Sequence, residues 1–372
     1  MKKFLNIFYN RKNTCESTDI ISIKLKSKKN RIVTQSNDIL VSVCLVTYNQ
    51  KEFIKDAIES ALMQKTNFEY EIVIGDDYST DGTLEICIDY ANKYPNKIKV
   101  LRRERNLGLL MNFFETIKKC RGELIAYLEG DDYWLTDNKL QQQAEILLKD
   151  NDISLVHTDW KDYILKDNIL KDNARNYKGA CKSETTQGIA GVKTFLANGY
   201  GGIRASSIMF RTFDINDIMV NNYDFFRDED IKTFDYFIFC QFSYRGFFRF
   251  LKEDAVLYRM NINSISIHTD IKKATDFSFG ALKTIMYLYR QFHIKNNKQY
   301  LFNRFLSSLL AYCLENNDHL LLEKINDSLK SFKTTTLIKH KFILFCMKHH
   351  LIIILRPLIY LNYLRNKHFS NV

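Results

Sequence analysis

The chain has 372 residues and a net charge of +11 that is unevenly distributed. Residues 1–40 carry nine Lys and Arg against three Asp and Glu, and residues 271–372 carry 16 against five, so the middle of the chain is acidic. This pattern argues against a nucleic-acid partner, because such a protein would carry its basic patch with interleaved motifs on the folded domain. Basic ends suit an anionic membrane surface, and a solvated basic face explains them nearly as well.

Cysteine usage and hydropathy indicate the compartment. The eight cysteines occur singly, without a CxxC pair, which excludes a zinc-ligand pattern and a disulfide framework. The start of the chain, MKKFLNIFYNRKN, is interrupted by Asn6 and Asn10 and is too short for a signal peptide. No stretch approaches the ~20 apolar residues of a spanning helix. We therefore expect a reduced, cytoplasmic protein.

The chain begins with residues 1–39, which are rich in Lys, Ser, Thr and Asn and form a basic amino-terminal arm without a clear period. From Val41 onward, apolar strands alternate with amphipathic helices, which indicates parallel pairing in a doubly wound α/β sheet. In such sheets, ligands bind at the carboxyl ends of the strands. The expected elements are strands at 41–47, 69–75, 97–103 and 122–130, and helices near 50–64, 82–94 and 109–120.

After residue 150 the alternation loosens. A polar stretch at 161–190 is expected to form a long loop or lid between two strands. Residues 275–372 interleave basic and apolar residues and are expected to be helical. The other expected elements are strands at 153–159, 205–211 and 248–258 and a helix near 228–245.

An acidic cluster ends the most apolar of these strands. The segment LIAYLEGDDYW places Glu129, Asp131 and Asp132 within four residues. Buried carboxylates that lie this close together repel one another unless a positive charge offsets them, and a hard divalent cation is the usual partner. A second acidic loop, IVIGDDYSTDG, follows the strand at 69–75. Together the two loops predict a nucleotide-diphosphate site at one edge of the sheet.

Four segments carry a resemblance to a known family: VSVCLVTYNQ, IVIGDDYSTDGT, NLGLLMN and LIAYLEGDDYW. In this order and spacing they resemble the nucleotide-sugar half of family 2 inverting glycosyltransferases, over roughly residues 40–265. The resemblance implies a GT-A-type doubly wound mixed sheet flanked by helices, with a C-terminal helical extension. The implied organisation is an arm at 1–39, a catalytic domain at 40–270 (nucleotide-binding half 40–135, acceptor half 136–270) and a basic helical region at 271–372.

The resemblance also implies contacts to the donor nucleotide. Tyr48 corresponds to the aromatic residue that the family places against the uracil ring, and Asp76 to the carboxylate that hydrogen-bonds the base. Asn106, in the NLGLLMN segment, is implied as a further nucleotide-sugar contact. Asp77 and Asp81 are instead expected to brace their own loop, since Asp in such turns bonds nearby backbone groups.

In the EGDD segment, Asp131 matches the family position that binds Mg²⁺ or Mn²⁺ directly. Glu129 stands where Asp is commoner in the family, within reach of the ribose or a metal-bound water. Asp132 is either a second metal ligand or a helix cap before Trp134. A cation held here would neutralise the diphosphate as it leaves.

The resemblance assigns the catalytic base to Asp235, in the segment FDYFIFCQFSYRG. An inverting transfer needs one carboxylate to accept the proton of the acceptor hydroxyl. Phe234 stands where the family usually has Gly. Glu229 and Asp230 are rival candidates that could instead cap the helix.

The segment VLYRMNINSIS resembles the closing element of the family, in which Arg259 and Ser264 match. Arg259 either contacts the diphosphate or forms a structural ion pair. Asn261 stands where the family often has His, and His268 is the nearest substitute.

The end of the chain, at 338–368, alternates short apolar runs with Lys, His and Arg. Two structures fit this pattern: a helix that lies in a membrane interface, and a helical cap on the catalytic domain. Membrane association is slightly favoured because a lipid-linked acceptor would require it.

We therefore expect an inverting glycosyltransferase that moves a sugar from a UDP-linked donor to a hydroxyl of a cell-surface glycan precursor, such as lipopolysaccharide or capsule, at the inner face of the cell membrane. Two alternatives remain open. A sugar-nucleotide-forming nucleotidyltransferase would carry a Gly-rich phosphate loop after its first strand, where this chain has TYNQKEF. A non-catalytic, membrane-associated adaptor on the same fold would show no donor hydrolysis.

Overall fold

The structure is a computed structural model, and its described part forms one unit that begins at Ile39. It describes residues 39–164, 169–172, 187–198, 203–232, 234–260, 270–294, 300–332, 340, 341 and 344. The amino-terminal arm and most of the 338–368 stretch lie outside the described residues.

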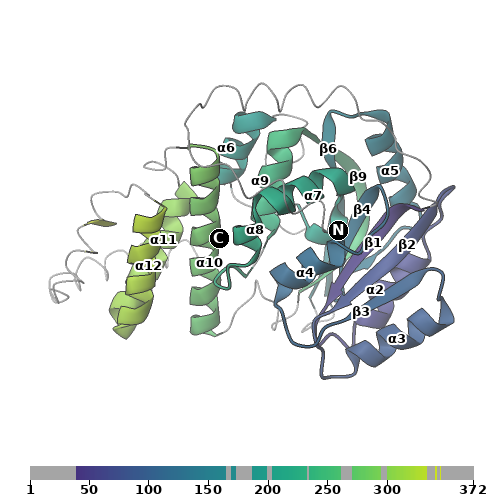
Figure 1. Ribbon diagram of the computed structural model, residues 1–372, viewed down its shortest axis with the longest axis horizontal. Coiled ribbons are helices and arrows are strands. Elements are labelled where there is room, and N and C mark those ends of the chain that lie inside the picture. Colours follow the sequence, from purple (N-terminus) through teal and green to yellow (C-terminus); the bar gives the residue numbers. More distant parts are fainter. Residues whose placement is uncertain are drawn as a thin grey trace, which may run out of the picture. The chain divides into compact units, whose positions relative to one another are not determined.

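The first half of the unit is a parallel sheet with helical crossovers (Figure 1). Strand β1 pairs in parallel with both β2 and β4, and β2 pairs in parallel with β3. The elements are β1 (Ile39–Thr47), α2 (Ile54–Leu62), β2 (Glu69–Asp76), α3 (Thr83–Lys93), β3 (Ile98–Arg102), α4 (Leu109–Ile117) and β4 (Leu124–Glu129).

The second half makes the sheet mixed. Strand β8 is antiparallel to β4 and β6, and β5 is antiparallel to β9, whereas β6 and β9 are parallel. Among the described residues, nine strands share one sheet in the order β3-β2-β1-β4-β8-β6-β9-β5, with β7 paired to β6. This architecture confirms the predicted GT-A-type α/β fold.

The elements of the second half are β5 (Tyr133–Trp134), α5 (Lys139–Lys149), β6 (Ile153–Ile164), β7 (Ile169–Asp172), α6 (Gly188–Asn198), the 3-10 turn η3 (Ala205–Ser207), β8 (Met209–Arg211), α7 (Thr212–Asn221), α8 (Tyr223–Phe226), α9 (Asp235–Arg245), β9 (Phe247–Met260), α10 (Ile271–Gln291), α11 (Tyr300–Asn316) and α12 (His319–Ser331).

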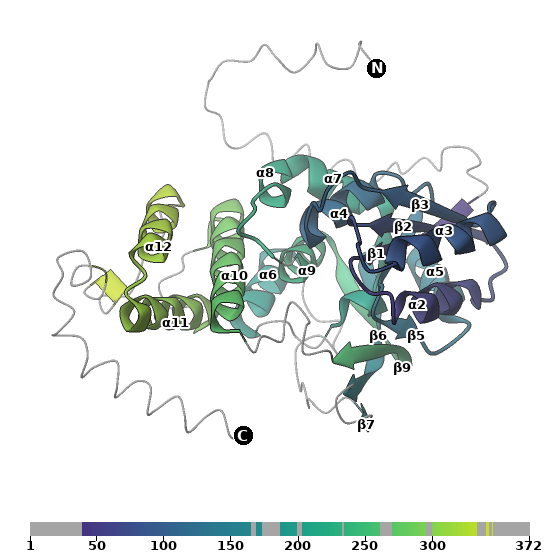
Figure 2. The same cartoon turned by 90° about the horizontal axis from the view of Figure 1, so that it is seen from below.

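Both faces of the sheet are buried, which explains why its strands are apolar at successive positions. Along β1, Val43 and Leu45 pack in one core with α2, α3 and α5, whereas Cys44 and Val46 pack in the other core with α4. Helices α6 to α12 contribute to this second core (Figures 1 and 2). The loops that follow β1 and β4 and the later helices α6 to α12 are thus connected through the same central strands.

Three expected elements were wrong in part. Residues 205–207 form a 3-10 turn instead of the start of a strand, and the helix expected near 228–245 begins only at Asp235. The stretch at 161–190 contains the end of β6, strand β7 and the start of α6, and its remaining residues lie outside the described part.

The helices after residue 270 contact the segment before α9 through a partly buried ion-pair cluster. The Lys283 Nζ of α10 lies 2.6 Å from Asp228 Oδ1 and 2.9 Å from Asp230 Oδ2. Lys324 of α12 approaches the other Asp230 oxygen at 3.5 Å. A Cβ on Gly280 would lie 2.4 Å from the Asp230 carbonyl oxygen, so α10 packs directly on this segment. Residues 228–232, which make these contacts, are not helical.

Within the described part of the chain, no helix combines the length and the apolar character that crossing a membrane requires.

Replacing Lys283 by Met should lower the free energy of unfolding by about 1–3 kcal/mol, because it removes the cation that Asp228 and the partly exposed Asp230 share. Chemical denaturation measures this change. Lys324→Ala is the matched control, since the Lys324 side chain is 53% exposed and pairs with the same Asp230. The control should lose less than about 1 kcal/mol. Equal losses in the two variants would contradict the assignment of Lys283 as the anchor.

Acid should weaken the same cluster. Burial alone would raise the pKa of Asp230, but the hydrogen bonds and charges of Lys283 and Lys324 outweigh burial and lower this pKa. A carboxylate with a lowered native pKa stabilises the fold above its unfolded pKa of about 3.9 and loses that effect as the pH falls through the native value. Asp230→Asn should therefore be less stable than wild type at neutral pH, and the difference should shrink below about pH 4. Thermal unfolding across this range is the measurement, and a pH-independent difference would refute the prediction.

Candidate active site

The carboxyl ends of β1, β2 and β4 meet at one edge of the sheet, as the sequence predicted. In the strand register Thr47 stands beside Asp76, and Val46 stands beside Glu129. The loops after these strands are joined by backbone hydrogen bonds: the Asp77 N–H donates to the Thr47 carbonyl at 3.0 Å. The loops after β1, β2 and β4, which carry residues expected to contact the nucleotide-sugar donor, therefore lie side by side.

Asp76 and Tyr48 form the part of this edge that is suited to a flat, hydrogen-bonding ring. Asp76 is fully buried, and its Oδ2 accepts a hydrogen bond from the Ser79 N–H at 3.0 Å. Its Oδ1 is buried and has no hydrogen-bond partner among the described residues. A buried carboxylate oxygen normally has a partner, so this atom is available to a ligand N–H. Tyr48 is 47% exposed, which leaves its ring accessible.

The expectation that Asp77 and Asp81 brace their own loop is confirmed for Asp81 and wrong for Asp77. Asp81 accepts from the N–H of Thr83 at the end of its own loop and from the N–H of Lys51 after β1, both at 3.0 Å. Asp77 accepts hydrogen bonds from the N–H groups of Leu107 and Gly108, in the loop after β3, at 2.7 and 2.8 Å. The Asn106 amide donates to the Asp77 carbonyl at 3.1 Å. Asn106 thus fastens the loop after β3 to the loop after β2, next to the predicted base site.

The acidic turn after β4 packs tightly on the end of β1. A Cβ on Gly130 would lie 2.4 Å from Gln50 Oε1 and 2.7 Å from Thr47 Oγ1, so only glycine fits between Glu129 and Asp131. The turn closes with a hydrogen bond of 3.1 Å from the Asp132 N–H to the Glu129 carbonyl. This close approach explains the glycine inside the EGDD segment.

Asp132 does not cap a helix, because strand β5 follows it. The Asp132 side chain is almost fully buried. Its Oδ2 accepts from the Ser206 hydroxyl at 2.6 Å, and its Oδ1 accepts from the Arg259 N–H at 3.2 Å. Each oxygen keeps further lone-pair capacity, so these bonds orient the carboxylate without removing it as a ligand.

The carboxylates of the turn raise one another's pKa values. Burial, followed by the charges of Asp132, Asp131 and Asp235, raises the pKa of Glu129 well above its ordinary value. Burial and the charge of Asp131 raise the pKa of Asp132 to about 7. Burial also raises the pKa of Asp131, against the opposing charge of Arg259. Negative charge is therefore unfavourable at this turn, and a bound cation would stabilise the charged carboxylates.

Asp235 lies at the start of α9, close enough for its charge to act on this turn. It interacts electrostatically with Glu129 and with the buried Tyr127 hydroxyl. Phe234, which replaces the family's usual glycine, stacks on Phe113 with ring centroids 4.2 Å apart and meets the Tyr127 ring edge-on at 5.3 Å. These rings belong to α4 and β4, so the aromatic cluster holds the start of α9 against the donor half.

The rival carboxylates have other surroundings. Asp230 is engaged by Lys283 and Lys324, and Glu229 is exposed. Neither residue caps α9, because the helix begins at Asp235. The structure therefore brings Asp235 to the acidic turn and keeps Asp230 in the docking cluster.

Arg259 forms a structural ion pair, one of its two expected roles. Its guanidinium pairs with Asp56 of α2 and donates from Nη1 to the Asp131 carbonyl at 3.1 Å. The rings of Phe53 and Tyr133 lie 5.2 and 4.9 Å from the guanidinium carbon. Arg259 thus ties β9 to α2 and to the acidic turn.

Three residues of the closing element cannot be placed in the site: Asn261, Ser264 and His268 lie outside the described residues.

Whether the acidic turn suits Mg²⁺ or Mn²⁺ depends on the ligands that it offers. Among the described residues, no cluster of three or more His, Cys, Asp or Glu side chains is arranged around one point. Mg²⁺ at a nucleotide site needs only one or two carboxylates, because phosphate oxygens and water complete its shell. Asp131 and Asp132 supply hard oxygen ligands where negative charge is crowded. The residues present therefore fit such a cation.

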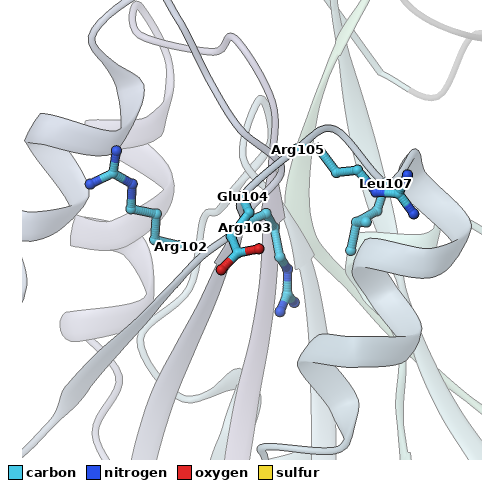
Figure 3. Close-up of a pocket in the computed structure, with 5 residues that line it drawn as sticks. All are labelled: Arg102, Arg103, Glu104, Arg105 and Leu107. Atoms are coloured by element: carbon cyan, nitrogen blue, oxygen red, sulfur yellow. The ribbon is translucent and has the colours of Figure 1, made fainter.

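A pocket of about 520 Å³ lies beside the donor loops, lined by Arg102, Arg103, Glu104, Arg105 and Leu107 (Figure 3). Arg102 and Arg105 point in opposite directions from the strand end. Arg103 turns inward and donates to Asn112 Oδ1 at 3.1 Å. The three guanidinium groups do not converge, so this pocket is not built as a single anion site.

Two residues that shape the site were not predicted from the sequence. Ser206 contacts the acidic turn from 74 residues away, and Tyr127 donates to Glu129 Oε1 at 3.3 Å from within β4. Ser206 lies in the unremarkable segment ASSIMF, and its contact joins distant segments, which leaves no local pattern. Tyr127 looks like a core aromatic residue because it stands in an apolar strand.

Comparison with known proteins gives partial matches to bacterial relatives. The chain is 39% identical over 107 residues to the uncharacterized protein Rv1520 of Mycobacterium tuberculosis, covering 29% of this chain and 31% of that protein. It is 33% identical over 115 residues to the UDP-Glc:alpha-D-GlcNAc-diphosphoundecaprenol beta-1,3-glucosyltransferase WfgD of Escherichia coli, covering 31% and 44%. These matches span less than half the length of either relative.

A solved structure shares the fold over most of the chain. S. aureus TarS, residues 1–349, in complex with UDP-GlcNAc, superposes with a TM-score of 0.52 at 20% identity and covers 90% of this chain and 89% of its own. The family model described as "Glycosyl transferase family 2" matches residues 42–250, more than half of the chain. The matched range contains β1, β2 and β4, the acidic turn and Asp235. The chain belongs to glycosyl transferase family 2.

Proposed function

We propose that this protein is an inverting glycosyltransferase that uses a UDP-linked sugar as its donor. The observation that carries the proposal is the convergence of three groups at one sheet edge. These groups are the base site at Tyr48 and Asp76, the acidic turn at Glu129–Asp132, and Asp235 beside that turn. The first group fits the nucleobase of the donor, the second fits its diphosphate, and the third fits the acceptor hydroxyl.

The donor assignment rests on the chemistry of the base site. The buried Asp76 Oδ1 can accept a hydrogen bond from the ring N–H of uracil, and Tyr48 offers an exposed face for stacking. Stacking of a base on an aromatic side chain contributes about 1–3 kcal/mol. Asn106 would hold the loop around the nucleotide, through its bond to the Asp77 carbonyl. The UDP-Glc donor in the name of WfgD supports the same nucleotide.

In the proposed reaction, the acceptor hydroxyl oxygen attacks the anomeric carbon from the face opposite the diphosphate. A bond forms between these two atoms while the bond from the anomeric carbon to the phosphate oxygen breaks. Asp235 accepts the hydroxyl proton, and the nucleoside diphosphate leaves with the electron pair. Asp131 and Asp132 would hold Mg²⁺ or Mn²⁺, which when bound offsets the charge of the leaving diphosphate. Glu129 would contact the ribose or a bound water, and Arg259 would contact the diphosphate.

The proposed acceptor is a glycan or lipid-linked glycan precursor of the cell surface. WfgD carries a diphosphoundecaprenol acceptor in its name, which supports a lipid-linked precursor. An anionic membrane surface at the cytoplasmic face is a proposed partner, supported by the 16 Lys and Arg of residues 271–372. The docking of Lys283 and Lys324 supports a packed cap for α10 and α12.

The two alternative functions receive less support. A nucleotidyltransferase does not explain the family match over residues 42–250. A non-catalytic adaptor would have no need of a buried, unpartnered Asp76 oxygen or of four mutually repelling carboxyl groups.

Asp131→Ala should abolish the gain in UDP affinity that Mn²⁺ produces, because it removes a cation ligand from the turn. The fold should remain intact, since the substitution also relieves carboxylate repulsion. Titration calorimetry of UDP with and without Mn²⁺ measures the effect. Asp137→Ala is the matched control, because Asp137 is a nearby surface carboxylate paired with Lys65 at 2.6 Å. Unchanged Mn²⁺-dependent affinity in Asp131→Ala would overturn the metal assignment.

Asp235→Asn should keep donor binding and lower turnover by about 10²–10⁴-fold, the usual span for the loss of a general base. The measurement is steady-state release of UDP from a UDP-sugar in the presence of acceptor. Asp230→Asn provides the comparison, because Asp230 is held by two lysines away from the turn. If Asp230→Asn caused the loss and Asp235→Asn did not, the base would be misassigned.

A further inference from the structure

The acidic turn is held by a residue that belongs to neither donor loop. Ser206 is fully buried in η3. Its hydroxyl donates to Asp132 Oδ2 at 2.6 Å and accepts from the Glu129 N–H at 3.2 Å. One hydroxyl thus satisfies an acceptor at one end of the turn and a donor at the other, and Asp131 lies between these ends.

The turn η3 is itself fixed from behind. The Trp134 indole donates to the Ser206 carbonyl at 2.8 Å, and the Gln143 amide donates to the Ser207 carbonyl at 2.8 Å. The Lys139 Nζ donates to the Gln143 oxygen at 2.8 Å. All five side chains are fully buried, so the backbone that carries the Ser206 hydroxyl is held by the core and by hydrogen bonds independent of the acidic turn.

We propose that Ser206 is a positioning residue of the donor site, which clamps both ends of the Glu129–Asp132 turn and so fixes the direction in which Asp131 faces. The inference rests on the proposed role of this turn in binding the donor diphosphate with a cation. Ser206 touches neither substrate nor cation in this proposal. It acts through Asp132 and the Glu129 backbone, and outer-shell partners of this kind typically change metal affinity or activity 10–100-fold.

The neighbouring serine provides a matched control. Ser207 is also fully buried in η3, and its hydroxyl donates to the Arg204 carbonyl at 2.7 Å. Replacing either serine by Ala removes one buried hydroxyl and one short hydrogen bond from the same turn. Only Ser206→Ala removes a contact to the acidic turn.

The test compares Ser206→Ala, Ser207→Ala and wild type by titration with UDP, with and without Mn²⁺. Ser206→Ala should weaken Mn²⁺-dependent UDP affinity by about 10–100-fold and raise the KM for a UDP-sugar. Metal-free UDP affinity should be equal in all three proteins, because Tyr48 and Asp76 lie on other loops. Ser207→Ala should match wild type in both titrations. A loss of similar size in the two variants would overturn the proposal.

A second measurement does not depend on the donor. Hydrogen–deuterium exchange without ligand should be faster over residues 129–132 in Ser206→Ala, and unchanged there in Ser207→Ala. If wild type bound no UDP with Mn²⁺, the donor assignment would fail, and the exchange experiment would still decide whether Ser206 holds the turn. Equal exchange in the two variants would refute the clamp. Should Ser206→Ala fail to fold, Ser206→Cys keeps the volume with a weaker donor and should show a smaller change of the same sign.

Discussion

The repulsion between carboxyl groups at the end of β4 is the constraint around which the site is built. Burial, followed by the charges of neighbouring acids, raises the pKa values of Glu129 and Asp132 there. The surrounding groups oppose this repulsion with hydrogen bonds and a cation: the Ser206 hydroxyl, the Arg259 backbone and guanidinium, and the Gln50 side chain. Segments that are distant in sequence are therefore joined at this point because the charges require partners.

The two parts of the site pack on opposite faces of the sheet. The acidic turn packs through Trp134 into the core that contains α2 and α5. Asp235 follows Phe234, which packs into the opposite core with α4 and the later helices. Only the central strands are shared by the two cores. The aromatic contacts of Phe234 with Phe113 and Tyr127 therefore hold the start of α9 against β4, the strand that leads into the acidic turn.

The donor half could be predicted from sequence because its information is local. Strands ending in acidic loops imply one sheet edge, and the register confirms that Asp76 and Glu129 lie on strands flanking β1. The largest omission is a contact between distant segments, whereas the missed Tyr127–Glu129 bond spans only two residues. No local period distinguishes Ser206 as a partner of the acidic turn, and residues 228–232, where the apolar pattern favoured a helix, carry the ion pairs to Lys283 instead. Tertiary ion pairs and buried hydroxyls override local propensity at such positions.

The docking of α10 on the segment before Asp235 has a consequence for how the protein can be altered. Gly280 touches the Asp230 backbone, and only four residues separate Asp230 from the start of α9. The later helices therefore support the chain where it enters α9. The loops after β2 and β3, by contrast, are held by hydrogen bonds of their own. A change in the packing of α10 would thus act first on the entry to α9, and the edge formed by β1, β2 and β4 would keep its own contacts.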